Sequence, residues 1–414
     1  MDIDLQRKID RVIGSMLCRI LSVFAGKGTS IGKDRQPSRF LVILLSEMGS
    51  LLLAYPMLQR IKNKYVNAKI YVLCFERNRE FLEILDVIPA ENIFTVRDGS
   101  FKTLMVDSIR ALAKMRKAKI DASLDCELFS RISSIYSLLS GASIRVGFHP
   151  YTQEGLYRGS FINRPVLYNP YQHISQQFIN LVEAIDRDQV PLVKRFPSKE
   201  TVKLPEVVVE EEKKRDMLRR MEHDFPQISA KRLVLLYPSG GLLPIRAWPL
   251  TYFCEVARNL LAEGLAVGVI GMEADREMAK EIQSCCQSEA CVDLTGYTRT
   301  LRDLLVLFHL AALLITNDGG PGHFASLTPL PAIIFYGPET PVLYGTLDQK
   351  SVHLYVPLTC SPCLTAYNHR NSPCDGDNVC LKRISPGQVL EKARQLLEEH
   401  AMVDTEDMIA DARG

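Results

Sequence analysis

The stretch LLITNDGGPGHFASLTPLPAIIFYGPETP, from Leu313 to Pro341, decides the fold. An apolar run ends there in a glycine-rich turn, Pro321 suits the first position of a helix, and a second apolar run follows from Ile333 to Tyr336. This order predicts a strand, a tight turn, a helix and a second strand. The first amide hydrogens of that helix have no carbonyl partner and carry the positive end of its dipole, so we expect the turn to bind a diphosphate.

Five residues of this turn are candidates for binding the diphosphate: Asp318, Gly319, Gly320, Gly322 and His323. The glycines would let the backbone approach a ligand closely, while the aspartate and the histidine flank the turn. A helix-capping role for Asp318 and a packing role for His323 stay open, as does a tight turn with no ligand at all.

Length and composition predict two domains and exclude several classes of protein. The chain has 414 residues, 47% of them hydrophobic, and a formal net charge of +2, so we expect two cores and no nucleic-acid partner. The longest apolar run, Leu304 to Thr316, is too short to span a membrane. The N-terminus lacks a signal-peptide cleavage pattern and the cysteines are scattered, which predicts a cytoplasmic protein.

Short apolar strands alternate with helices in both halves, which predicts an α/β fold of two Rossmann-like, doubly wound domains. We place an N-terminal domain at 39–190 and a linker with a C-terminal domain at 191–395, because prolines and a charge run interrupt the alternation there. Ligands of open α/β sheets bind at the carboxyl ends of strands, so the two sets of loops should face each other across a cleft. We place an acidic tail at 396–414 and expect it to be frayed or disordered after Glu398.

Residues 1–38 form a separate segment, with an amphipathic helix and a linker. Apolar side chains recur there at three- and four-residue steps: Ile9, Val12, Ile13, Met16, Leu17, Ile20, Leu21 and Phe24. Arginines and lysines occupy much of the remainder, so the helix is basic as well as amphipathic. Two interpretations stay open. The helix packs on the domain that follows, or it attaches the protein to a membrane surface.

Several segments resemble glycosyltransferase family nine, which contains the ADP-heptose:lipopolysaccharide heptosyltransferases of Gram-negative bacteria. They are Thr316–Ser326, Phe335–Pro341, Asp293–Leu304 and Phe40–Tyr65, and the likeness covers roughly residues 39–395. The resemblance implies a GT-B architecture and inverting transfer of a sugar from a nucleotide diphosphate. Its heptosyltransferases imply ADP-heptose as the donor and a lipopolysaccharide core or a related lipid-linked saccharide as the acceptor. The resemblance therefore also implies a peripheral protein at the cytoplasmic face of the inner membrane.

Three other functions stay open beside this one. They are a glycosyltransferase with a different nucleotide sugar, a non-catalytic glycosyltransferase-like assembly protein, and a zinc-dependent binding module.

The resemblance also implies roles in donor binding. Arg246, where the family usually has lysine, would place a positive charge near the diphosphate, and Glu273 would bind the ribose hydroxyls. Gly319 stands where the family usually has threonine or serine, which removes a hydroxyl donor and leaves more of the binding to the backbone.

The catalytic base is the larger departure from the family. Its members generally have aspartate after the glycine of the first loop, and this chain has Ser50, which cannot accept a proton usefully near neutral pH. Glu47 lies in the same loop and becomes our candidate base. Glu127, in a loop after another strand, is the second candidate, and inertness or a different base stays open.

Two further groups are weaker candidates. The arginines that would suit a phosphorylated acceptor are Arg131, Arg145, Arg158 and Arg164, although each alone is more typical of a surface or structural residue. The cysteines with the spacing C-x2-C-x10-C-x5-C are Cys360, Cys363, Cys374 and Cys380. That spacing suits a structural zinc site, with buried or paired thiols as the alternative. No other cofactor is predicted, and assistance by a divalent cation is left open.

Overall fold

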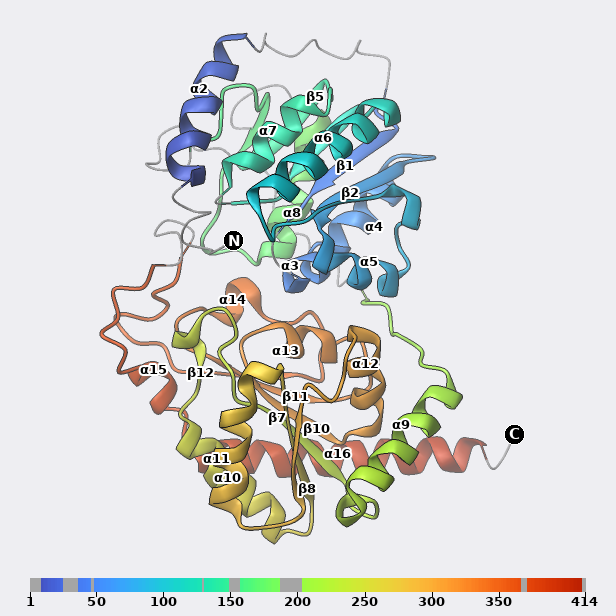
Figure 1. Ribbon diagram of the computed structural model, residues 1–414, viewed down its shortest axis with the longest axis vertical. Coiled ribbons are helices and arrows are strands. Elements are labelled where there is room, and N and C mark those ends of the chain that lie inside the picture. The colour runs from blue at the N-terminus through green and yellow to red at the C-terminus, as the bar shows by residue number, and fades with distance from the viewer. Residues whose placement is uncertain are drawn as a thin grey trace. The chain divides into compact units, whose positions relative to one another are not determined.

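The computed structural model describes residues 9–24, 36–45, 48–128, 130–148, 157–186, 203–365 and 371–411, with side chains up to residue 399. Contacts divide the chain into two compact units, residues 1–202 and 203–414. Each unit is built on one parallel six-stranded sheet with helices packed against it (Figure 1). This is the predicted α/β fold of two doubly wound units.

The first unit has the strand order β3-β2-β1-β4-β5-β6, so the order reverses between β1 and β4. The strands are β1 (Arg39–Ile43), β2 (Lys69–Phe75), β3 (Ile93–Val96), β4 (Ala122–Asp125), β5 (Ile144–Phe148) and β6 (Arg164–Val166). The helical elements are η1 (Asp10–Gly14), α2 (Ser15–Phe24), α3 (Met48–Leu53), α4 (Tyr55–Lys64), η2 (Glu76–Asn78), α5 (Arg79–Leu85), η3 (Ala90–Asn92), α6 (Phe101–Ala118), α7 (Arg131–Leu139), α8 (Ile174–Glu183) and η4 (Ala184–Asp186).

Buried strand residues of this unit alternate between two apolar layers, because successive side chains of a strand point to opposite faces. Leu41 and Ile43 of β1 pack in one cluster with Met115 of α6 and Tyr136 of α7, so these two helices cover one face of the sheet. Phe40 points to the other face, where its ring lies 4.8 Å from that of Tyr65 at the end of α4.

The second unit has the strand order β12-β11-β10-β7-β8-β9, which reverses between β7 and β10. The strands are β7 (Leu233–Tyr237), β8 (Ala266–Gly271), β9 (Cys291–Thr295), β10 (Leu313–Asn317), β11 (Ala332–Tyr336) and β12 (Val352–Tyr355). The helical elements are α9 (Glu211–Asp224), η5 (Pro226–Ile228), η6 (Pro244–Arg246), α10 (Leu250–Ala262), η7 (Glu273–Asp275), α11 (Arg276–Cys286), α12 (Leu301–Leu310), α13 (Gly320–Ala325), α14 (Pro341–Tyr344), α15 (Val379–Lys382) and α16 (Pro386–Asp411).

The last helix, α16, continues to Asp411, so it includes part of the predicted acidic tail. Leu396 and Leu397 are buried in the same cluster as Val389 and Ala393, so the apolar face of the helix extends to the first residues of the tail. Among the described residues, no helix is both long enough and apolar enough to cross a bilayer.

Candidate functional site

The carboxyl ends of the strands in the second unit bring four loops to one edge of the sheet, called here the carboxyl edge. The order reverses between β7 and β10, which is where open α/β sheets bind ligands. Arg246 follows β7, Asp318 follows β10, Glu339 follows β11 and Glu273 follows β8. The predicted donor residues and one further carboxylate therefore gather at this edge.

The glycine-rich turn has the predicted form. β10 is buried throughout, and α13 begins at Gly320, with Gly319 as its N-cap residue and Pro321 in its first turn. A Cβ placed at Gly319 would come no closer than 3.9 Å to another atom, so the backbone is open there. Gly322 differs, because a Cβ there would lie 2.8 Å from Cδ1 of Ile334. Its missing side chain serves helix–strand packing and not the approach of a ligand.

Asn317, the last residue of β10, fixes the loop after β7. Its Nδ2 donates to the carbonyl oxygens of Pro238, at 2.8 Å, and Ser239, at 3.2 Å, and its Oδ1 accepts the backbone N–H of Trp248 at 2.8 Å. These bonds hold both ends of the loop, and Arg246 with it, beside the turn after β10. Sequence reasoning did not single out Asn317, although a fully buried amide at the end of a strand is typical of such a clamp.

Arg246, Asp318 and Glu339 form one charged group at the carboxyl edge. The Arg246 guanidinium makes an ion pair with Glu339 through Nη2, and its Nε lies 3.5 Å from Oδ2 of Asp318. Both carboxylates are buried, whereas the Arg246 side chain is 16% exposed. Neither this Nε nor this Oδ2 has a hydrogen-bond partner in the part of the chain that the structure describes. The Arg246 side chain is nevertheless partly exposed, so its positive charge lies at this edge where an anionic ligand could meet it.

Glu339 was not among the predicted site residues. Burial raises its pKa to about 8, while Arg246 opposes this rise and Asp318 adds to it. The raised pKa favours the protonated form of Glu339, which would lessen the negative charge around the guanidinium. The signal in the sequence was a carboxylate three positions after the buried run that ends at Tyr336.

We expect Glu339 to make the free energy of unfolding depend on pH. Its folded pKa lies above the ordinary value of 4.5, so the folded state binds the extra proton between these two values. Stability from this group is full below the ordinary value and is lost as pH rises through about 8. In urea unfolding, wild type should lose about 2 kcal/mol or more relative to Glu339→Gln between pH 5 and pH 8.5. Glu255→Gln, at an exposed carboxylate on α10, is the control, and equal pH slopes in all three proteins would contradict the assignment.

The remaining donor candidates also lie at the carboxyl edge. Glu273 is exposed in η7, and its Cγ would lie 2.8 Å from a Cβ placed at Gly296, which follows β9. His323 is buried within α13, as its packing alternative requires. The ribose contact of Glu273 stays a prediction.

The candidate bases belong to the first unit. Ser50 lies in α3 and is half-buried, whereas Glu47 lies outside the described residues. Glu127 is buried, and its Oε1 accepts a hydrogen bond of 2.6 Å from the backbone N–H of Leu45. β1 and β4 are neighbouring parallel strands, so their carboxyl ends lie side by side. Glu127 is therefore hydrogen-bonded to Leu45, which precedes Glu47 by two residues in the sequence.

The expected acceptor-binding surface of arginines needs correction. Arg131, Arg145 and Arg158 are all buried in the first unit. Arg145 donates to the carbonyl oxygens of Phe161 and Ala142, and Arg131 pairs with Asp10. Arg164, half-buried in β6, donates to the carbonyl oxygen of its neighbour Asn163. The charge pattern was visible in the sequence, but these guanidinium groups bind the protein's own carbonyls and carboxylates and do not form an open surface.

Removing Arg158 should destabilise the protein strongly, because its guanidinium is the ion-pair partner of the fully buried Asp125. Burial raises the pKa of Asp125 and Arg158 opposes this, so Arg158→Met would leave a buried carboxyl without its charge partner. We expect a loss of about 3–5 kcal/mol in the free energy of unfolding, measured by urea denaturation. Arg77→Met, in the exposed pair with Asp98, should cost at most about 1 kcal/mol, and similar losses in both variants would contradict this account.

Two of the four late cysteines, Cys363 and Cys380, contact the loop after β11, whereas Cys360 and Cys374 are exposed. The backbone N–H groups of Cys363 and Leu364 both donate to the carbonyl oxygen of Pro338, and a Cβ at Gly337 would lie 2.9 Å from Sγ of Cys380. None of the four forms a disulfide. Over the described ranges, no group of three or more His, Cys, Asp or Glu side chains is placed to hold a metal ion. The zinc site stays a prediction, and the segment supports the loop that carries Glu339.

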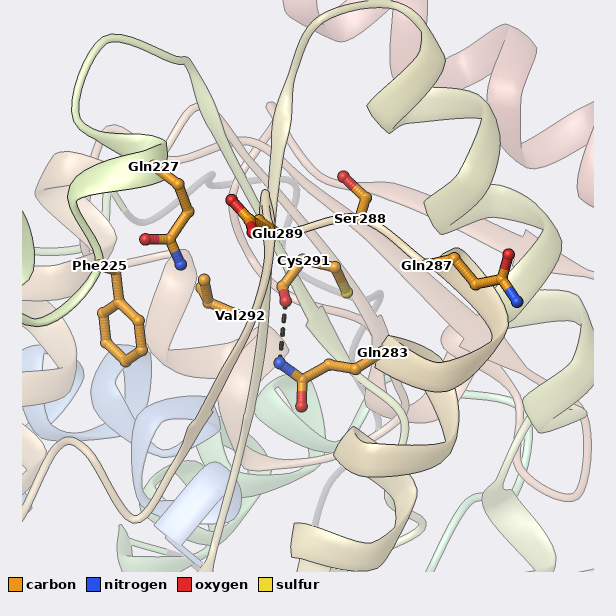
Figure 2. A pocket seen from close by; sticks show the side chains of 8 residues that line it. All are labelled: Phe225, Gln227, Gln283, Gln287, Ser288, Glu289, Cys291 and Val292. Atoms are coloured by element: carbon orange, nitrogen blue, oxygen red, sulfur yellow. Dashed lines mark hydrogen bonds between the residues drawn. The ribbon is translucent and has the colours of Figure 1, made fainter.

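A separate pocket lies at the opposite edge of the same sheet (Figure 2). Cys291 and Val292, which line it, are the first residues of β9, and Phe225 and Gln227 come from the segment before β7. Gln283 closes one side by donating Nε2–H to the carbonyl oxygen of Cys291 at 2.9 Å. The predicted donor residues do not line this pocket, so we exclude it from the candidate site.

A comparison with family models supplies the family of the chain. A model described as glycosyltransferase family 9 (heptosyltransferase) matches residues 110–372, more than half of the chain. The chain belongs to glycosyltransferase family 9. The matched residues include Arg246, Asp318 and Glu339 of the carboxyl edge.

Relatives and solved structures of the family agree with this placement. Lipopolysaccharide heptosyltransferase 2 of Salmonella typhimurium is 28% identical over 184 residues, which cover 43% of this chain and 51% of that protein. The aligned region thus spans about half the length of this curated relative. The solved structure of E. coli ADP-heptose LPS heptosyltransferase II has a TM-score of 0.67 at 20% identity, covering 88% of this chain and 99% of that one. E. coli heptosyltransferase WaaC with ADP-2-deoxy-2-fluoro heptose has a TM-score of 0.58 at 16% identity, covering 87% and 99%. These structures share the fold.

Proposed function

We propose that the protein is an inverting glycosyltransferase that moves heptose from ADP-heptose to a lipopolysaccharide core or a related lipid-linked saccharide. The observation that carries the proposal is the carboxyl edge of the second unit, where Arg246 lies against two buried carboxylates beside an open glycine turn. Membership of family 9 supports glycosyl transfer. The names of the relatives, which include ADP-heptose and lipopolysaccharide, support this donor and this acceptor.

The leaving group of such a transfer is a nucleoside diphosphate, whose negative charge grows as its bond to the anomeric carbon breaks. Backbone N–H groups of the turn after Asp318 would bind its phosphates, and the partly exposed guanidinium of Arg246 would place its positive charge beside them. Protonated Glu339 would keep the site free of a second negative charge while holding the guanidinium in place.

The acceptor hydroxyl must lose a proton as it attacks. We propose Glu47 as the base, because Ser50 replaces the aspartate that the family resemblance leads us to expect and Glu47 is the carboxylate of the same loop. Glu127 is the second candidate, and its hydrogen bond to Leu45 keeps its carboxylate beside that loop.

A non-catalytic, glycosyltransferase-like assembly protein is the second candidate function. The pair Ser50 and Gly319 favours it, since both positions lack the side chain that the family resemblance predicts. Such a protein would bind a nucleotide sugar without releasing ADP.

We also propose that the protein works at the cytoplasmic face of the inner membrane, where a lipid-linked acceptor would be available. A lipid-linked saccharide keeps its acyl chains in the bilayer, so its sugar hydroxyls lie close to the membrane surface. A peripheral enzyme would reach them there.

Release of ADP in the presence of membrane glycolipid tests the proposal. Purified protein should release ADP from ADP-heptose only when glycolipid is added, and UDP-glucose in place of ADP-heptose should give no nucleotide. Release of UDP from UDP-glucose, with no release of ADP from ADP-heptose, would show that the donor is a different nucleotide sugar. Binding of ADP-heptose without ADP release under any of these conditions would favour the assembly protein.

A further inference from the structure

The helix formed by η1 and α2 packs on the first unit through its small and polar face. Asp10, Gly14, Cys18 and Ser22, spaced four residues apart, all point toward the protein. A Cβ at Gly14 would lie 3.1 Å from Cβ of Arg131, and Cys18 is completely buried. Small side chains on this face therefore let the helix lie close to α7, its neighbour in Figure 1.

Specific hydrogen bonds hold the helix in this orientation. Oδ1 of Asp10 accepts the first two backbone N–H groups of α7, that of Arg131 at 2.8 Å and that of Ile132 at 3.0 Å. At the other end, Oγ of Ser22 accepts the backbone N–H of Ser160 at 3.0 Å and lies 3.1 Å from the hydroxyl of Tyr157. The carboxylate of Asp10 also interacts favourably with the positive end of the α7 dipole. These contacts fix which face of the helix points outward.

The opposite face of the helix is apolar and lies in water. Val12 is 69% exposed, Val23 79% and Phe24 80%. The rest of the exposed apolar face is formed by Ile13, Met16, Leu17 and Ile20. An amphipathic helix packed on a protein normally buries its apolar face, and here that face is turned outward. A contiguous apolar face of this kind marks an interaction surface.

The charge of the same face points to an anionic partner. The described helix, residues 9–24, has two basic residues, Arg11 and Arg19, and a single acidic one, Asp10, which is engaged with α7. Arg11 and Arg19 are exposed beside the apolar side chains. A symmetric dimer through this face would bring arginines of like sign together, whereas an anionic bilayer would neutralise them.

A second helix on the same side of the sheet has the same character. α6 exposes Phe101, Met105 and Ile109, and Lys102 and Arg110 are exposed beside them. Its one carboxylate, Asp107, is buried and paired with Arg97. α6 is bonded to α7 through Ser108 and Tyr136, so α7 has a basic, apolar helix on either side.

We infer that the η1–α2 helix is an interfacial anchor, which inserts its apolar face into the surface of an anionic phospholipid bilayer while its small-residue face stays docked on the first unit. This inference deepens the membrane location proposed above and names the surface responsible for it. It does not depend on the sugar that is transferred, because phospholipid alone is the partner.

Co-sedimentation of the full-length protein with vesicles tests this inference. Wild type should bind vesicles of equal parts phosphatidylcholine and phosphatidylglycerol and bind phosphatidylcholine alone at least about tenfold more weakly. Val12→Asp/Val23→Asp should weaken binding to the anionic vesicles at least about tenfold. The matched control is Val66→Asp/Val208→Asp, with the same charge change at equally exposed valines, and it should bind as wild type does.

Three outcomes would overturn the inference. They are no binding of wild type to anionic vesicles, equal loss in both double variants, and a wild-type dimer, seen by sedimentation equilibrium, that Val12→Asp/Val23→Asp breaks without any change in vesicle binding. Circular dichroism and urea unfolding of each variant establish that it is folded. The vesicles contain no saccharide acceptor, so failure here leaves ADP release untouched, and loss of ADP release in solution would not affect vesicle binding.

Discussion

Replacing Glu47 with glutamine should lower kcat by about 10²–10⁴-fold, because an amide cannot take the proton of the acceptor hydroxyl. The Michaelis constant for the donor should change little, since the diphosphate is bound by the second unit in this account. Glu127→Gln is the comparison, and the variant that removes the base should also lose the acidic limb of the pH profile of kcat/KM. That readout separates a base from a residue that only supports its loop.

A rescue experiment sharpens the assignment of the base. If Glu47 replaces the aspartate expected one position after Gly49, then Ser50→Asp in the Glu47→Gln background should restore part of the lost kcat. Wild-type turnover in Glu47→Gln would contradict the assignment, and a loss confined to Glu127→Gln would transfer the role to Glu127.

Replacing Arg246 with alanine should lower kcat/KM by about 10²–10³-fold, because the diphosphate would lose a fixed positive charge in a partly desolvated site. Arg246→Lys keeps the charge but not the planar fork, so we expect an intermediate loss. Steady-state kinetics of ADP release measures both variants. Arg258→Ala, at an exposed arginine on α10, is the matched control and should keep wild-type kinetics.

Folding must be separated from catalysis in the alanine variant, because removing the guanidinium leaves Asp318 and Glu339 buried without it. The double variant Arg246→Ala/Asp318→Asn removes the carboxylate of Asp318 together with its cationic partner and should recover stability without recovering kcat/KM. If a folded Arg246→Ala protein keeps wild-type kcat/KM, the arginine is structural and the proposed diphosphate contact is wrong.

The donor side of the site was largely predictable from the sequence because its signals are local. A buried apolar run, three glycines and Pro321 define the strand, the turn and the helix start without any distant contact. Glu339 escaped notice because its neighbours Arg246 and Asp318 are brought to it only by the strand order β11-β10-β7. Its raised pKa is a consequence of burial, which the residue type does not reveal.

The N-terminal helix shows a different limit. Its 3.6-residue period was clear, and both a packed helix and a membrane helix were compatible with that period. The structure shows a helix that packs through the face we had left unassigned. Small residues at four-residue spacing, Gly14, Cys18 and Ser22, were the available signal, and hydrophobicity alone drew attention to the other face.

The arginines of the first unit were misjudged for a related reason. Sequence shows that Arg131, Arg145 and Arg158 are close in number and all basic, but it does not show that each meets carbonyl or carboxylate oxygens inside the unit. A buried Asp at the end of a strand, such as Asp125, was the sign that a cation had to lie nearby.

Mass spectrometry of the glycolipid acceptor after incubation with ADP-heptose tests the central claim most directly. The account predicts that the acceptor gains one heptose residue for each ADP released, and that Arg246→Ala and Glu47→Gln proteins form far less of this product. An acceptor of unchanged mass, whether or not ADP is released, would contradict the claim that this protein transfers heptose.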